Sequence, residues 1–430
     1  RYGRRRTVQF VMAAPALVKI LLSLALILVA ARVTKNVTIA ILAGTLILAF
    51  WAGHPAGGVA RIAWQRFSEL DNLVLTLVIV LVIWLSGQMA ETGVMNRLVS
   101  SFQSGVSNRA SMALLPALVG LLPMPGGALF SAPLVDQCDN DRTIPAVVKG
   151  RINYWFRHIW EYWWPLYAGV LLAVELSGLQ LWHFMAAGIP VTIFSAAGGW
   201  IFLIRKVPRR ERHGKTRFDL SSLVPVFLVV VIYGLISLLV PAAGEVSNYL
   251  PIAIGIVVAM VYLQIRDPLS WDRWKRIVFS WKTAGLALLV VVIRIYGAFL
   301  EAPLPNGELI VEQMRLELES GGVPILPLIM IIPFIAGLTT GIALGMVGAS
   351  FPIIVQLAGA DPSTATMLSI AILGYAAGHV GQLVSPVHVC LLVTNEYFST
   401  SIVQSLRGLW GPYLFVLAGG LLVSRLIQFL

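Results

Sequence analysis

The chain has 430 residues, of which 58% are hydrophobic and only 12% are charged. Soluble domains carry about 25% charged residues, and a soluble fold of this size could not bury so much apolar surface, so the composition indicates an integral membrane protein. The net charge of +11 would favour nucleic-acid binding in a soluble protein. Because basic residues gather in the cytoplasmic loops of membrane proteins, we expect no nucleic-acid partner here.

Long apolar runs predict an all-α protein with about ten membrane-spanning helices, because about 20 apolar residues cross the hydrocarbon layer. The expected spans are 10–31, 37–53, 72–89, 153–177, 180–204, 222–241, 249–265, 283–301, 366–395 and 403–428. The first run follows a basic start but is too long for a signal peptide, so it is expected to be a retained span.

Two other apolar segments, Ser111–Val135 and Pro324–Leu357, are interrupted near the middle by Gly, Pro or Thr. Unpaired backbone cannot face lipid, so a broken segment must be enclosed by protein or line a cavity. Each segment is therefore predicted to form a re-entrant helical hairpin. The predicted turns contain Pro125, Gly126 and Gly127 in the first hairpin and Thr339, Thr340 and Gly341 in the second.

The two halves of the chain resemble each other. Aligning Tyr154 with Tyr375 also aligns His158 with His379, Glu161 with Gln382 and Pro165 with Pro386. Upstream, PALVG at 116–120 matches PFIAG at 333–337. Each half holds five crossings, an odd number, so the second half must enter the membrane in the opposite sense, as in many secondary transporters.

We therefore expect two inverted-topology repeats, residues 1–204 and 222–430, each with one hairpin and one broken helix, at about 153–177 and 366–395. Between them lies the basic linker 205–221. Lys and Arg concentrate in this linker and in 32–36, 90–152 and 266–282, which predicts that these segments are cytoplasmic. The acidic segment Glu301–Glu319 is then external, although the basic start RYGRRR points the other way.

The order of elements and the paired hairpins resemble the ion transporter superfamily, which includes divalent-anion:sodium symporters and the large membrane subunits of tripartite transporters. The motifs MPGGALFSAP (Met124–Pro133) and GMVGASFP (Gly345–Pro352) look most like an uncharacterised ten-span family of that superfamily. The resemblance implies elevator-type movement of the hairpins and broken helices against a scaffold, and a homodimer in a prokaryotic inner membrane. The Ser-Asn-Thr hairpin tips of the sodium/dicarboxylate members are absent, so neither sodium nor dicarboxylate is carried over.

The hairpin turns are the first candidate site. Helix N-termini favour anions, and carbonyl groups at helix breaks suit Na⁺. Alternatively, these glycines have no binding role and serve to let the helices pack closely. We include Ser131 and Ser350, which follow the two turns, among the expected binding residues.

The broken helices are the second candidate site. RHIWEYWWP brings Arg157, His158 and Glu161 onto one helix face. Its counterpart GHVGQLVSPVH offers His379, Gln382, Ser385 and His388. Ionisable groups inside membrane spans are functional candidates. The alternative is a structural Arg–Glu ion pair that holds two helices together.

Arg294 lies inside an apolar span with no acidic residue within one helical turn. It needs an anionic partner, which could be Glu161, Glu301 or a substrate. We include it among the expected binding residues.

These features predict a secondary transporter for a small organic anion, coupled to Na⁺ or H⁺, with no catalytic residues and no cofactor. His158-x-x-Glu161 lacks the zinc-protease spacing and no Walker A sequence occurs, so the only expected metal is Na⁺ at the hairpin-tip carbonyls. The alternatives are an intramembrane lipid-modifying enzyme, with His158 and Glu161 as acid and base, and a membrane subunit of a multi-component transport system.

Overall fold

A computed structural model describes residues 15–94, 97, 107–122, 127–139, 141–208, 220–304, 307–359 and 361–429. Within these ranges the chain is helical and forms no strand beyond one isolated bridge between Pro303 and Leu309. The described part contains seven helical stretches that are long and apolar enough to cross a membrane: Ala16–Thr34, Leu70–Glu91, Leu181–Lys206, Ser221–Leu239, Trp271–Glu301, Thr364–Tyr397 and Trp410–Gln428. The protein is therefore an all-α integral membrane protein.

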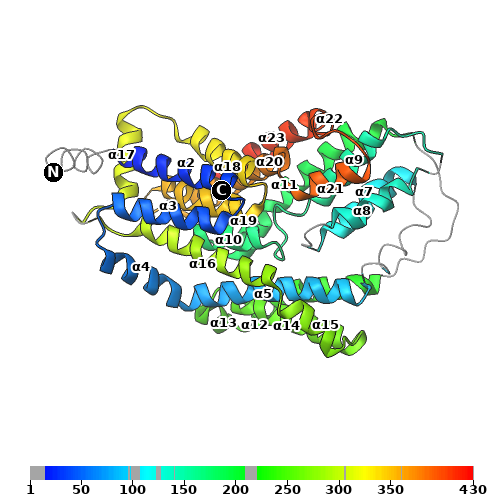
Figure 1. Cartoon of the computed structure of the whole chain (residues 1–430), viewed down its shortest axis with the longest axis horizontal. Coiled ribbons are helices and arrows are strands. Elements are labelled where there is room, and N and C mark those ends of the chain that lie inside the picture. Colours follow the sequence, from blue (N-terminus) through cyan, green and yellow to red (C-terminus); the bar gives the residue numbers. More distant parts are fainter. Residues whose placement is uncertain are drawn as a thin grey trace.

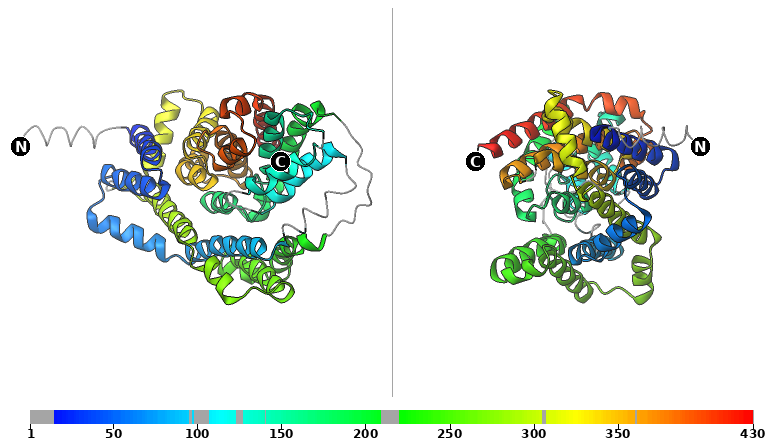
Figure 2. Two further views of the ribbon diagram at one scale, coloured as in Figure 1. Left: turned by 45° about the vertical axis from the view of Figure 1, so that its right-hand side comes forward. Right: turned by 90° about the vertical axis from the view of Figure 1, so that its left-hand side faces the viewer.

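One set of helices, which we call the peripheral group, packs together around the left end and along the bottom of the molecule as drawn in Figure 1 (see also Figure 2). Its members are α2 (Ala16–Thr34), α3 (Val37–Trp51), α4 (Ala56–Ser68), α5 (Leu70–Glu91), α12 (Val224–Leu239), α14 (Leu250–Arg266) and α16 (Trp281–Glu301). In Figure 1, α5, α12 and α14 form the lower layer. The apolar side chains on their outer faces stay exposed, as expected for helices in contact with lipid.

A second set of helices, the hairpin group, lies above that layer in Figure 1. Its members are α7 (Asn108–Gly120), α8 (Ala128–Asp136), α9 (Ala146–Arg157), α10 (Ala168–Ser177), α11 (Leu181–Phe202), α18 (Ile325–Thr340), α19 (Ala343–Ile354), α20 (Thr364–Val384), α21 (Val389–Tyr397) and α23 (Trp410–Gln428). The helices α10, α18 and α19 also contact the peripheral group.

Short helices complete the described chain: α13 (Pro241–Val246), α15 (Trp271–Val278), α17 (Ile310–Ser320), α22 (Ile402–Arg407) and the 3-10 turns Ile204–Lys206, Leu220–Leu223 and Val355–Ala358. The amphipathic helix α4 was not predicted. It has no buried residue and exposes Trp64, which is typical of a helix lying at a membrane surface.

Each predicted span coincides with a described helix or pair of helices. The span expected at 403–428 is in fact divided, because α22 ends at Arg407 and α23 begins at Trp410. The spans 37–53 and 249–265 fold as the shorter helices α3 and α14. Residues 1–14, where the first expected span begins, and most of the basic linker lie outside the described residues.

Both segments expected to be hairpins contain two consecutive helices that pack against each other: α7 with α8, and α18 with α19. The second turn contains Gly341 at φ 66°, a left-handed conformation that glycine adopts without steric cost. Residues 123–126 of the first turn, including Pro125 and Gly126, lie outside the described residues.

Both expected helix breaks are present. The first separates α9 from α10 over residues 158–167, and the second separates α20 from α21 over residues 385–388. Each break contains a proline, Pro165 or Pro386, which lacks a backbone donor and so disfavours a continuous helix through the break.

Candidate functional site

The two helix breaks and the second hairpin turn surround a cavity of about 240 Å³, which we call the inner cavity. It is lined by Arg157, His158, Glu161, Tyr167, Ala168, Gly169, Leu286, Gly341, Ile342, Ala343, Leu344, Gln382, His388, Val389 and Cys390. Only Leu286 belongs to the peripheral group. The cavity therefore lies within the hairpin group, at its contact with α16.

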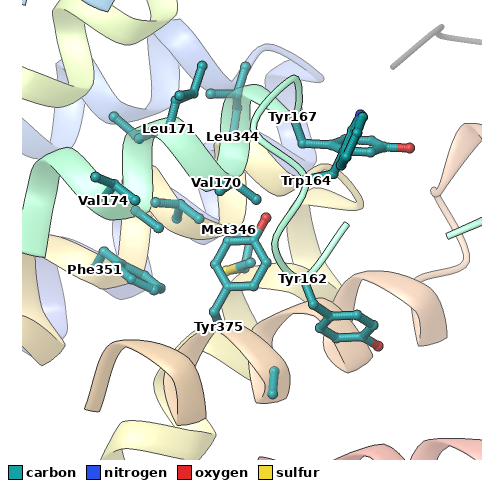
Figure 3. Close-up of a cluster of buried hydrophobic side chains, with 14 of the residues drawn as sticks. Tyr162, Trp164, Tyr167, Val170, Leu171, Val174, Leu344, Met346, Phe351 and Tyr375 are labelled. Carbon is teal, nitrogen blue, oxygen red and sulfur yellow. The ribbon is translucent and has the colours of Figure 1, made fainter. Parts of the chain in front are cut away.

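Tight apolar packing supports one wall of this cavity (Figure 3). Val170 and Val174 of α10 pack with Met346 and Phe351 of α19 in one buried cluster. The hydroxyl of Tyr375 points toward α10, next to Gly169. The first residues of α10 and α19 are thus held in fixed positions beside the cavity.

Glu161 is a buried carboxylate, 5% exposed, and it joins the first break to α20. Its Oε2 atom lies 3.1 Å from His379 Nε2 and accepts a hydrogen bond of 3.2 Å from Gln382 Nε2. Its Oε1 atom lies 3.8 Å from His158 Nε2. A buried carboxylate requires such partners, because desolvation is otherwise costly. The structure therefore brings together four residues that the sequence assigned to the site.

Two histidines meet across the same space. His158 Nε2 and His388 Nε2 are 3.1 Å apart. The Nδ1 atoms of both rings are hydrogen-bonded to backbone carbonyl oxygens, that of His158 to Tyr154 and that of His388 to Gly341, each at 2.6 Å. Cys390 Sγ lies close to both rings, and the three potential ligand atoms, one from each residue, are within 4.8 Å of one another.

Arg157 links the first hairpin to the first break. Its guanidinium lies where a Cβ atom on Gly127 would be, and its carbonyl oxygen lies where a Cβ atom on Gly120 would be. Gly120 must be glycine because a side chain there would meet the Arg157 backbone, whereas a side chain at Gly127 would have to displace the Arg157 guanidinium. Gly127, an expected site residue, thus positions Arg157, which itself lines the inner cavity.

The close approach at Gly120 has a counterpart in the second half. The carbonyl oxygen of Gly378 lies where a Cβ atom on Gly337 would be. In the sequence alignment of the two halves, Gly337 corresponds to Gly120 and Gly378 to Arg157. Each hairpin therefore packs on its broken helix through an equivalent glycine contact.

A hydrogen bond recurs in the same way. Trp164 Nε1 donates to the carbonyl oxygen of Leu121 at 3.0 Å, and Ser385 Oγ donates to that of Leu338 at 2.7 Å. Trp164 corresponds to Ser385, and Leu121 to Leu338. Ser385, expected in the site, therefore anchors the second break to the second hairpin.

Thr339 and Thr340 lie apart from Glu161. They line a second cavity of about 640 Å³, the outer cavity, together with Ala31, Arg32, Lys35, Val37, Ile342, Val387 and Val389. Their hydroxyls donate to carbonyl oxygens one turn back, each at 2.8 Å. Ile342 and Val389 line both cavities, so the two cavities are neighbours.

Ser131 and Ser350, both expected in the site, line neither cavity. Ser131 donates to the carbonyl oxygen of Gly127 at 3.4 Å, and Ser350 to that of Met346 at 2.6 Å. Both serines are fully buried. Their hydroxyls are satisfied within their own helices, so they do not face the inner cavity.

Arg294 pairs with neither Glu161 nor Glu301, the two side-chain partners expected from the sequence. Its guanidinium is 2.5 Å from Glu175 Oε1, at the end of α10, and 3.7 Å from Glu69 Oε2. Glu301 pairs with Arg66 instead. Arg294 lines neither cavity, so in this structure it joins the peripheral group to α10.

Sequence reasoning left Tyr167 and Cys390 out of the site. Tyr167 donates to the carbonyl oxygen of Gly120 at 2.5 Å, and Cys390 lies two residues after His388 in the segment HVC. The His-x-Cys spacing next to a helix-breaking proline is the signal that could have identified Cys390.

Outside the spanning helices, Asp139 organises the loop between α8 and α9. Its carboxylate accepts hydrogen bonds from the backbone N–H groups of Thr143 and Ile144, at 3.1 and 2.9 Å, and lies 3.6 Å from Lys149 Nζ. Burial raises the pKa of Asp139, but the two backbone bonds and the nearby ammonium outweigh it and hold the pKa below its usual value.

Comparison with known proteins finds solved structures of similar fold. The structure of the YdaH transporter of Alcanivorax borkumensis, described as having an unusual topology, aligns with a TM-score of 0.57 at 15% sequence identity. The alignment covers 87% of this chain and 90% of that one. At this identity the likeness shows a common fold.

No curated protein matches the chain. One family, described as "Protein of unknown function (DUF401)", matches residues 17–427, which is nearly the whole sequence. The chain therefore belongs to the DUF401 family.

Proposed function

We propose that this protein is a secondary active transporter that carries a small organic anion through the inner cavity. The observation that carries the proposal is the position of three helix N-termini. The first two residues of α10 (Ala168, Gly169), of α19 (Ala343, Leu344) and of α21 (Val389, Cys390) all line the inner cavity.

Helix N-termini present unpaired N–H groups and a partial positive charge, so three of them around one cavity favour a bound anion. Arg157 adds a full positive charge to the same lining. The apolar remainder of the lining suits the carbon skeleton of a small organic acid. Arg32 and Lys35 in the outer cavity would attract the same anion toward the inner one.

The likeness in fold to a protein described as a transporter supports transport over the alternatives. We propose that the two halves are inverted-topology repeats, with hairpins that enter the membrane from opposite faces. In an elevator-type movement the hairpin group would carry the anion past the peripheral group, driven by a Na⁺ or H⁺ gradient. The peripheral group would also supply the contact of a homodimer in the cytoplasmic membrane.

Uptake by proteoliposomes tests the proposal. The purified protein is reconstituted, and uptake of labelled short mono- and dicarboxylates is measured under imposed Na⁺ or H⁺ gradients. Ala168→Phe fills the inner cavity and should abolish uptake. Its matched control is Ala186→Phe, at an exposed position of α11, which should transport normally.

Two variants at the hairpins complete the test. Gly127→Val would displace the Arg157 guanidinium and should abolish uptake, and Thr340→Val, in the outer cavity, should reduce it. Normal uptake by Ala168→Phe, or the absence of gradient-driven uptake of any carboxylate in the wild type, would overturn the proposal.

We further propose the orientation in which the linker after α11 is cytoplasmic and the segment after α16 is external, from the distribution of basic residues. Single cysteines at the exposed positions Lys206 and Glu308 test it, because both native cysteines are buried. An impermeant thiol reagent added to intact cells should label only the cysteine at 308. Labelling at 206 would reverse the orientation.

A further inference from the structure

We propose that His158, His388 and Cys390 form a binding site for a transition-metal ion, with Zn²⁺ as the first candidate. The three side chains come from the two helix breaks, and all are buried. The proposal concerns metal binding alone and does not depend on the transported substrate.

The argument begins with the protonation of the two imidazole rings. The Nδ1 atom of each ring lies 2.6 Å from a backbone carbonyl oxygen, which can only accept a hydrogen bond. Each Nδ1 must therefore carry a proton. In the neutral ring the Nε2 atom is then an acceptor with a free lone pair.

The two Nε2 lone pairs consequently face each other across 3.1 Å. Two acceptors at this distance repel unless a positive group lies between or beside them. The thiol of Cys390 has one proton and can satisfy one nitrogen, not both. A metal ion bound to both nitrogens and to the thiolate satisfies all three atoms at once.

The distances suit such an ion. Two imidazole nitrogens bound tetrahedrally to Zn²⁺, with bonds of about 2.0 Å, are separated by about 3.3 Å, close to the observed 3.1 Å. The three ligand atoms are within 4.8 Å of one another, a spread that coordination would contract. Backbone carbonyls bonded to the other ring nitrogen are also typical of metal-binding histidines, whose orientation they fix.

The surroundings balance the charge of the ion. Cys390 is the second residue of α21, where the helix N-terminus favours a thiolate. Glu161 contributes a second negative charge, with Oε1 3.8 Å from His158 Nε2. Arg157 also lines the cavity, and its positive charge repels a bound cation. The site therefore favours an ion that binds nitrogen and sulfur strongly over Mg²⁺ or Ca²⁺.

All three ligands line the inner cavity. A three-ligand site leaves the fourth tetrahedral position open, as in zinc sites that bind small molecules. Because the three ligands line the cavity, a carboxylate or water would reach that position from the cavity.

Co²⁺ substitution in the purified full-length protein tests the site. After treatment with a chelator, the wild type in detergent should bind one Co²⁺ per chain and show the near-ultraviolet thiolate-to-Co²⁺ absorption band, and Zn²⁺ should displace it. Cys390→Ser should lose the thiolate band. The chain offers a matched control, since Cys138→Ser alters the other buried cysteine and should keep the band. His388→Gln should weaken Co²⁺ binding by at least about tenfold.

X-ray absorption of the wild-type Zn²⁺ complex provides a measurement that does not rely on the folding of a variant. It should report two nitrogen ligands from imidazole and one sulfur ligand. A wild type that binds neither Co²⁺ nor Zn²⁺ would show that the two histidines share a proton instead, and the proposal would be wrong. An unchanged thiolate band in Cys390→Ser, or a zinc shell without sulfur, would overturn it equally. None of these measurements requires transport, so their failure leaves the proposed function untouched.

Discussion

The ion pair between Arg294 and Glu175 can be tested by replacing one or both partners. The two side chains are 7% and 9% exposed, and their charged atoms are 2.5 Å apart. With charge centres about 4 Å apart and an effective dielectric constant of about 20, the attraction is about 4 kcal/mol. Arg294→Met removes it and leaves the carboxylate of Glu175 buried without its main partner, which costs about 3–5 kcal/mol.

The double variant Arg294→Met/Glu175→Leu should behave differently, because it removes both buried charges. Replacing a buried ion pair with apolar residues is often neutral or stabilising, so we expect the double variant to recover most of the lost stability. The free energy of unfolding is measured by denaturation with SDS in mixed micelles for the wild type, both single variants and the double variant. A thermodynamic cycle then gives the coupling energy of the pair.

A coupling energy near zero would refute the interpretation of Arg294 as a structural residue. Uptake by the double variant is the second measurement. Because Arg294 lines neither cavity, a correctly folded double variant should transport as the wild type does. If the double variant folds but does not transport, the conclusion would be that Arg294 contributes to the substrate site.

Three further predictions follow from single contacts. Gly337→Ala places a methyl group on the carbonyl of Gly378 and should lower the free energy of unfolding by about 1–3 kcal/mol, whereas Gly285→Ala, with open space around it, should cause no loss in the same SDS assay. Asp139→Asn should lower the free energy of unfolding at pH 7, and this loss should shrink below about pH 4. The reason is that a carboxylate with a lowered pKa in the folded state stabilises the fold above its unfolded pKa, and this stabilisation is lost as the pH falls. A loss that does not change with pH would contradict the prediction. Arg32→Gln/Lys35→Gln should raise the KM for anion uptake and weaken its dependence on salt with little change in maximal rate, and an unchanged KM would remove the outer cavity from the pathway.

The sequence was sufficient to predict the fold class and most helix positions, because lipid imposes simple rules on apolar segments and on helix breaks. It also predicted that Glu161, His158, His379 and Gln382 belong together. Polar residues are rare in these spans, and the internal alignment placed them on corresponding breaks.

The misses have equally physical causes. Ser131 and Ser350 resemble binding residues in sequence, but a serine hydroxyl in a helix can bond to its own backbone. Glu175 lies at the end of α10, far along the chain from Arg294, and no local pattern reveals a pair formed between distant helices. In the sequence, Cys390 looks like one more apolar residue of a spanning helix. It lies next to His158 and His388 only in the folded structure, where the two helix breaks meet.

The bond between Glu161 and Gln382 joins two positions that are equivalent in the internal alignment. In the proposed pair of inverted repeats, residues that meet their own counterparts would lie on the two-fold axis that relates the halves. In a symmetric ancestor, made of two identical half-length chains, this position would face a copy of itself. Two ionised carboxylates at 3.2 Å would repel and would have to share a proton, whereas an amide of almost the same shape donates a hydrogen bond to the remaining carboxylate. A single chain allows the two positions to differ, as two identical half-length chains could not, so the Glu/Gln difference leaves one carboxylate here in place of two.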